Sequence, residues 1–263
     1  MTASHKTPYY KNTAVFNTIG YIMVIAVNAM ASLNMLNGKS PANISEKYSN
    51  LFTPAGITFS IWGIIYLSLL GFIIYQLWLA FSGKHQPELE VFMERLRAWW
   101  LFTCLANTCW LFTWHYELLP LSMLIMIVLL VSLFAIHMNF NIAIQKVSWP
   151  EKLFIHIPFS LYLGWICVAT VANIGALNVY LGGSGTSITW TIFLILICTV
   201  TVSLLVIKRK NITIGIVALW ALCGIILKRQ EAAGPEAFPL TIACIVAMVL
   251  IVLTALIQLM KKR

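Results

Sequence analysis

The chain has 263 residues, of which 60% are apolar and only 10% are charged, and its mean hydropathy is +0.89. Soluble domains average about 45–50% apolar and about 25% charged residues, so the composition excludes a soluble enzyme and predicts an integral membrane protein. The formal charge is +9, and all eight acidic residues are Glu, which removes any site built on paired aspartates.

Long apolar runs divide the chain into membrane-spanning segments. A helix needs about 17–25 such residues to cross the hydrocarbon core, and an isolated strand there would leave its backbone groups unpaired. The predicted fold class is therefore an all-α integral membrane protein. Eight runs meet the required length, of which the third and seventh are the shortest: 14–34, 57–82, 98–114, 119–145, 153–176, 188–207, 212–228 and 239–260.

The first run ends in Ala29-Met30-Ala31, which is similar to a signal-peptidase cleavage site. However, Asn17 and Asn28 interrupt the apolar core that a signal peptide needs, and the run is longer than such cores usually are. We therefore interpret 14–34 as a membrane span.

The positive charges fall mainly on one side of the predicted bundle. With eight spans, all but four of the seventeen Lys and Arg lie on the side of the two termini, and cytoplasmic loops carry such an excess. We predict a multi-pass protein of the cell membrane with both termini cytoplasmic and with basic clusters against lipid headgroups. No basic stripe with interleaved aromatic residues occurs, so no nucleic acid is expected as a partner. The four exceptions are Lys39, Lys47, Lys228 and Arg229.

The apolar runs offer little material for catalysis or metal binding. None has a charged residue near its centre, which argues against an ion-coupled pump. The six cysteines form no CxxC pair and no zinc-site spacing, and no carboxylate pair is present. His137 and His156 would ligate a haem iron only if they faced each other, and interfacial histidines are the simpler interpretation. We predict no catalytic residue, no metal ligand and no enzyme activity.

Aromatic and amide residues recur at helical spacing in three spans, and the first span offers Asn17, Tyr21 and Asn28 in addition. Such a set would line a cavity in which rings stack on a flat ligand while amides orient its polar edge. Alternatively, the amides join helices by hydrogen bonds worth about 0.6–2 kcal/mol each, and the tryptophans form the interfacial belt. The shared faces comprise Phe59, Trp62 and Tyr66 in the second span, Asn107, Trp110 and Trp114 in the third, and Trp165, Ala169 and Asn173 in the fifth.

Three short motifs occur in order within these same spans. They are Pro54 followed by Trp62 and Tyr66, then Asn107-Thr-Cys-Trp110, then Ala169-Thr-Val-Ala-Asn173. Together they resemble the translocator protein family, also called tryptophan-rich sensory proteins (TspO/MBR), over roughly residues 14–181. The resemblance implies a five-helix bundle that binds tetrapyrroles such as protoporphyrin, or other planar or sterol-like molecules, between its helices. It also implies that the first extramembrane loop acts as a lid.

The resemblance favours the cavity interpretation of the shared faces. It implies no required cofactor, and a porphyrin or haem-like tetrapyrrole as the ligand. By position, the resemblance implies six ligand contacts: Trp62, Tyr66, Asn107, Trp110, Ala169 and Asn173. The shared helix faces add Phe59 and Trp165 to these six. The full predicted ligand-binding set is Phe59, Trp62, Tyr66, Asn107, Trp110, Trp165, Ala169 and Asn173.

The sequence also departs from the family pattern. Gly56 stands where the family usually has Trp, and Ile174-Gly175-Ala176-Leu177 replaces the aromatic run that normally follows Asn173. Three further spans follow the fifth, whereas typical members end there. We expect a longer, divergent member with a TspO-like five-helix unit over 1–181 and a three-helix extension over 182–263 that serves packing or partner binding.

The leading functional hypothesis is a membrane protein that binds a small hydrophobic, planar ligand, with a sensory or transport role. One alternative is an uncoupled facilitator or permease for an amphipathic solute. Another is a ligand-free assembly partner of a different membrane protein. A homodimer through a face of small residues is a further expectation.

Overall fold

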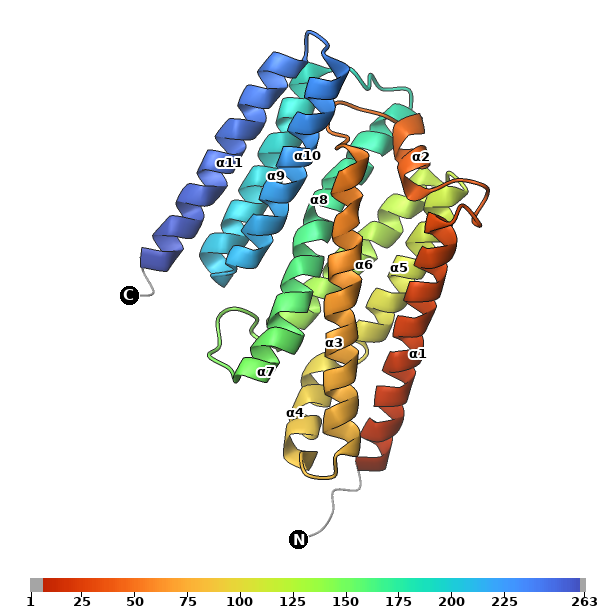
Figure 1. Ribbon diagram of the computed structural model, residues 1–263, viewed down its shortest axis with the longest axis vertical. Coiled ribbons are helices and arrows are strands. Elements are labelled where there is room, and N and C mark those ends of the chain that lie inside the picture. Colours follow the sequence, from red (N-terminus) through yellow and green to blue (C-terminus); the bar gives the residue numbers. More distant parts are fainter. Residues whose placement is uncertain (1–6, 261–263) are drawn as a thin grey trace.

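Apolar runs in a bilayer must satisfy their backbone hydrogen bonds internally, and here they do so as helices. The computed structural model describes residues 7–260, and Figure 1 shows the long helices running side by side in alternating directions. These are α1 (Thr7–Ser32), α3 (Ile61–Phe81), α5 (Trp99–His115), α6 (Leu119–Asn139), α8 (Ile157–Tyr180), α9 (Ile188–Arg209), α10 (Ile212–Ala232) and α11 (Ala237–Met260).

Short elements occupy the connections between the long helices. The side chain of Ser40 caps α2 (Pro41–Lys47), and Asn43 bonds back to the cap, which sets where that helix starts. The single 3₁₀ turn η1 (Gly56–Ser60) leads directly into α3, and α4 (Gln86–Leu96) packs against α3. The turns α7 (Trp149–Glu151) and η2 (Lys152–His156, π-helical) continue directly into α8.

Seven helices in the described part of the chain are long and apolar enough to cross a membrane, counting η1 with α3 and α7 with α8. The predicted all-α membrane fold is thus confirmed, but only seven of the eight predicted spans meet this measure. The remaining one is α5, whose 17 residues extend about 26 Å, slightly less than the hydrocarbon core of about 30 Å. Helix α5 packs against both α1 and α6, alongside the spans.

Aromatic rings fill the bundle at the end where α1 begins. The ring centroid of Phe72 on α3 lies 5.0 Å from that of Trp100 on α5 and 4.9 Å from that of Phe159 on α8. All three side chains are fully buried, and the indole N–H of Trp100 donates a 3.0 Å hydrogen bond to the carbonyl of Asn17. Edge-to-face and tilted contacts of this kind stabilise a close-packed interior. We call Phe72, Trp100 and Phe159 the aromatic core.

Helices α9, α10 and α11 pack on one another and join the rest of the bundle mainly through α8. Glycine allows the close approach of α8 and α10, because a Cβ added at Gly164 would lie 3.2 Å from the Cα of Ile214. Helix α10 also contacts η1, at the end of the bundle opposite the aromatic core. The C-terminal helices therefore reach the segment that begins α3.

Candidate functional site

The bundle encloses a cavity of about 690 Å³ at the end opposite the aromatic core. Its wall is formed by the last turns of α1, the first turns of α3, the second half of α5 and the middle of α8, and by residues 40–45 around α2. Asn50, Phe52, Thr53 and Pro54, the end of η1 and two residues of α10 complete it. This volume falls within the range of about 300–1,000 Å³ that is typical of small-molecule sites.

Seven of the eight predicted ligand-binding residues lie in the wall of this one cavity. The eighth, Asn107, is not among the lining residues. The residues come from η1 and from three helices that are far apart in sequence, α3, α5 and α8. The seven are Phe59, Trp62, Tyr66, Trp110, Trp165, Ala169 and Asn173.

One aromatic wall is formed by η1, α3 and α8. The rings of Trp62 and Tyr66 are stacked, with centroids 5.3 Å apart and an interplanar angle of 17°. Trp165 stands at 81° to Trp62 with centroids 6.1 Å apart, and at the same angle to Phe59 at 6.0 Å. Both arrangements suit the quadrupoles of the rings, so the wall holds its shape without a ligand.

A second aromatic group comes from α5. Trp110 and Trp114, one turn apart, are stacked with centroids 5.4 Å apart, and both line the cavity. The indole N–H of Trp110 donates to Oδ1 of Asn173 at 3.3 Å, and that of Trp114 donates to the carbonyl of Pro41 at 3.1 Å. These bonds connect α5 to α8 and to α2, so the position of each indole ring is fixed by a second element.

The predicted amides act as links between helices. Asn107 accepts a 2.9 Å bond from the amide of Asn28 on α1 and donates a 2.9 Å bond to the hydroxyl of Tyr162 on α8. Its side chain therefore joins three helices beneath the cavity and is not directed to a ligand. Asn173 lines the cavity, and its amide exchanges longer bonds with the hydroxyl of Ser122 on α6, at 3.3 Å and 3.4 Å. Asn107 thus links helices, as the alternative interpretation of the amides has it. Asn173 both links helices and lines the cavity.

Two buried side-chain donors in the wall, the indole N–H of Trp165 and the hydroxyl of Tyr66, have no hydrogen-bond partner among residues 7–260. Trp165 is only 3% exposed. A buried N–H without a partner costs about 1–3 kcal/mol, and a ligand oxygen would recover part of that cost.

The two histidines considered as haem ligands, both buried, lie away from the cavity. His137 is in the last turn of α6, where its Nε2 is 3.3 Å from the amide nitrogen of Asn211, and Nδ1 of His156 accepts a 3.4 Å bond from the backbone N–H of Ala143. Neither residue lines the cavity. No cluster of three or more His, Cys or Glu side chains suited to a metal ion occurs within residues 7–260.

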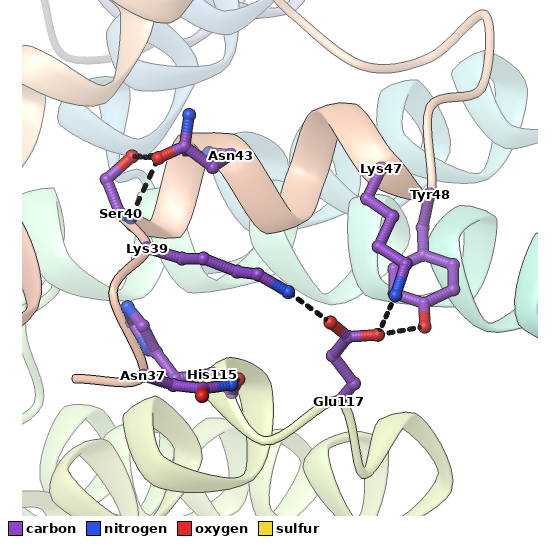
Figure 2. A network of polar contacts seen from close by, with 8 residues as sticks. All are labelled: Asn37, Lys39, Ser40, Asn43, Lys47, Tyr48, His115 and Glu117. Carbon is purple, nitrogen blue, oxygen red and sulfur yellow. Dashed lines mark hydrogen bonds and ion pairs between the residues drawn. The ribbon is translucent and has the colours of Figure 1, made fainter. Parts of the chain in front are cut away.

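Residues 37–48, which we call the lid segment, contribute Ser40, Pro41, Ala42 and Ser45 to the cavity wall and are attached to the turn between α5 and α6. Glu117 is the centre of this attachment (Figure 2). Its carboxylate accepts bonds from Nζ of Lys39 at 2.7 Å and from the hydroxyl of Tyr48 at 2.6 Å, and Lys47 forms a further ion pair with it. Glu117 itself has a φ of 59°, an unusual backbone conformation for a residue other than glycine.

These contacts shift two pKa values outside the membrane. Bonds from Lys39, Lys47 and Tyr48 lower the pKa of Glu117 from 4.5 to about 2. Burial and then the bond to Glu117 raise the pKa of Tyr48 to about 12. Because the pKa of Glu117 is lowered, the stabilisation from its ionised carboxylate is complete above pH 4.5 and is lost as the pH falls toward 2. Because the pKa of Tyr48 is raised, the stabilisation from its neutral phenol is complete below pH 10 and is lost as the pH rises toward 12. The attachment is therefore complete at neutral pH.

Replacing Glu117 by Gln is expected to loosen the lid segment while leaving the bundle folded. The amide carries no charge for Lys39 and Lys47, and partly exposed ion pairs are worth about 0–1 kcal/mol each. We expect backbone hydrogen exchange in residues 40–48 to accelerate about five- to tenfold, measured by mass spectrometry at pH 7. Glu46→Gln is the control, because the side chain of Glu46 is 59% exposed and its ion pair within residues 7–260 is a long one, to Lys228 at 3.8 Å. Equal exchange in both variants would contradict the role of Glu117.

Of the polar face that the first span offers, Asn28 lines the cavity, and so do residues of the first extramembrane loop that the resemblance implies as a lid. Sequence reasoning missed the wall residues contributed by α10. Ala221 and Ile225 of α10 are ordinary apolar residues in an apolar run, so nothing in the sequence distinguishes them.

Comparison with protein-family models gives one match, to the model described as TSPO-like protein, over residues 14–257. The match covers nearly the whole chain and continues beyond residue 181 into α9, α10 and α11. The searches of curated proteins and of solved structures found no match.

Proposed function

The chain belongs to the TSPO-like protein family, and from that premise we propose that it binds a hydrophobic, planar, tetrapyrrole-like molecule in the aromatic cavity, with a sensory or transport role. The observation that carries the proposal is the convergence of seven predicted contacts, from η1 and three separate helices, on one cavity. The family is not a known enzyme family, and we assign the chain no catalytic role.

The chemistry of the wall favours an uncharged, flat ligand. Among residues 7–260, no Lys, Arg, Glu or His contributes to the lining, whereas six aromatic rings from η1, α3, α5 and α8 do. Flat π-systems gain about 0.5–1.5 kcal/mol per aromatic contact beyond the area that they bury. The six rings are Phe59, Trp62, Tyr66, Trp110, Trp114 and Trp165.

The same lining favours a metal-free porphyrin over haem. Iron in haem is usually held by His, Cys, Met or Tyr, and of these the described lining residues include only Tyr66, whose ring is stacked on Trp62. The ligand's polar edge is expected near Trp165, whose unpartnered N–H donates to a carbonyl or carboxyl oxygen. Asn173 is the second polar contact, although its amide already bonds to Ser122 and Trp110.

The ligand is proposed to enter from the bilayer between α1 and α3. Ala29 and Ser32 on α1, and Ser60 and Gly63 at the start of α3, line the cavity and are also exposed. All four are small, and a Cβ added at Gly63 would meet nothing within 4 Å. Exposed apolar side chains such as Ile64 flank this gap, so it faces acyl chains.

We place the protein in the cell membrane with both termini cytoplasmic. The first turn of α1 and the last turn of α11 lie toward the same side of the bundle (Figure 1), and the excess of Lys and Arg is on that side. The opposite side has only four of the seventeen Lys and Arg, which is the asymmetry that sets orientation, and each of the four lies within 4.0 Å of a glutamate carboxylate. The pairs are Lys39 and Lys47 with Glu117, Lys228 with Glu46, and Arg229 with Glu236.

Titration of the protein in lipid nanodiscs with protoporphyrin tests the proposal. Only four of the ten tryptophans line the cavity, so we expect partial, saturable quenching of tryptophan fluorescence with a midpoint in the micromolar range. Empty nanodiscs are the control for partitioning into lipid. Quenching that rises linearly, with no saturation beyond the control, would contradict a binding site.

Transport is the second candidate function, because the cavity has a lateral opening toward the bilayer between α1 and α3. A facilitator would exchange labelled for unlabelled ligand across proteoliposomes without any ion gradient, since no charged side chain lines the cavity in the described residues. Saturable binding without counterflow would favour sensing. The absence of both would favour the ligand-free assembly partner.

A further inference from the structure

Helix α10 of the C-terminal three-helix unit forms part of the cavity wall. Ala221 and Ile225 line the cavity and are only 2% and 1% exposed. Their spacing of four residues places them on one face of the helix. Among the described residues of α9, α10 and α11, these two line the cavity. The three-helix unit therefore contributes to the cavity wall through one turn of α10.

The same turn of α10 holds η1 in place. The backbone N–H of Ala55 donates a 2.9 Å bond to the carbonyl of Gly224, and the indole N–H of Trp220 donates a 2.9 Å bond to the carbonyl of Thr58. Gly224 has no room for a side chain, because an added Cβ would lie 1.9 Å from Oγ1 of Thr58. The backbone of η1 therefore rests directly on α10.

The position of η1 determines where the first aromatic wall stands. Phe59 belongs to η1, and Trp62 follows in the first turn of α3. Both make edge-to-face contacts with Trp165 of α8, so η1 is held from α10 on one side and by the aromatic wall on the other. A movement of α10 would therefore alter the shape of the cavity at the rings proposed to contact the ligand.

We propose that α10 is part of the ligand site, with Ala221 and Ile225 determining how large a ring system the cavity accepts. This proposal rests on the proposed function, because it assigns a role in the same cavity. The short side chain of Ala221 leaves space in the wall, and Ile225, one turn further along, limits that space. The C-terminal helices are then required for ligand selection in addition to packing.

The test compares protoporphyrin binding by matched variants of α10 in nanodiscs. Ala221→Phe adds a ring that projects into the cavity, and we expect the affinity to fall at least tenfold. Cys223→Phe is the control, because Cys223 lies on the same helix but is exposed on its outer face, and its affinity is expected to stay within twofold of the wild type. Ile225→Ala enlarges the wall without crowding it, and we expect an affinity reduced about threefold or more through lost contact.

The outcomes separate this proposal from the proposed function. If Trp62→Ala abolishes binding while Ala221→Phe and Ile225→Ala both bind like the wild type, the role of α10 is wrong and the cavity remains the site. If the wild type shows no saturable binding, both proposals fall. If Ala221→Phe does not purify as a monodisperse protein, Ile225→Ala decides: reduced affinity supports the proposal, and unchanged affinity overturns it.

Discussion

Replacing Trp62 by Ala is expected to lower the affinity for protoporphyrin at least tenfold. Trp62 lines the cavity, stacks on Tyr66 and makes edge contacts with Trp165, so its loss removes a ligand contact and also loosens the wall. Truncating an aromatic side chain that stacks on a flat ring costs about 1–3 kcal/mol, and about 1.4 kcal/mol corresponds to tenfold in affinity. Fluorescence titration in nanodiscs measures the change.

Trp78→Ala is the matched control for this experiment. Trp78 lies on the same helix, α3, but it is 49% exposed and packs against Tyr75 and His85, away from the cavity. We expect its affinity to remain within twofold of the wild type. An equal loss of affinity in the two variants would mean that general damage to α3, and not a missing ligand contact, explains the result.

Replacing Gly224 by Ala is expected to destabilise the protein by about 2 kcal/mol, although alanine is normally the better helix former. Helix propensity alone would stabilise by about 0.5–1 kcal/mol. The new Cβ, however, would lie 1.9 Å from Oγ1 and 2.9 Å from Cβ of Thr58, and overpacking of a close contact typically costs about 1–3 kcal/mol. For a chain of this size the midpoint of thermal unfolding should fall by about 4–8 °C.

Gly63→Ala provides the control for this substitution, because an added Cβ there meets nothing within 4 Å and should leave stability unchanged or raised. Adding Thr58→Ala to Gly224→Ala removes the nearest hydroxyl and should recover part of the lost stability. A Gly224→Ala variant as stable as Gly63→Ala would show that η1 is not held closely on α10.

Helix positions could be predicted from the sequence because a long apolar run in the hydrocarbon core must satisfy its backbone hydrogen bonds internally, as a helix does. The predicted run 57–82 is found as Gly56–Phe81, and 239–260 as Ala237–Met260. Helix α6 ends at Asn139 instead of residue 145, because Asn141 and Ala143 adopt positive φ and break the helix. Apolarity alone does not reveal such a turn.

The site was predictable only where the sequence carries a pattern. The predicted residues on α3, α5 and α8 recur every three or four positions, and this spacing by itself places those of each helix on one face. Asn107 shares that spacing, yet its amide is used between Asn28 and Tyr162, and no spacing rule separates a ligand contact from a link between helices. The participation of α10 depends on tertiary packing at Gly224, for which a single apolar run gives no signal.

The aromatic core bears on how any bound molecule could travel. Phe72, Trp100 and Phe159 occupy the interior beyond the cavity floor, and none of them lines the cavity. A guest the size of a porphyrin could pass to the opposite leaflet only if these rings rotated apart together. Without such a rearrangement, uptake and discharge take place in the same monolayer, and the protein would act as a reservoir or detector for molecules dissolved in that half of the membrane.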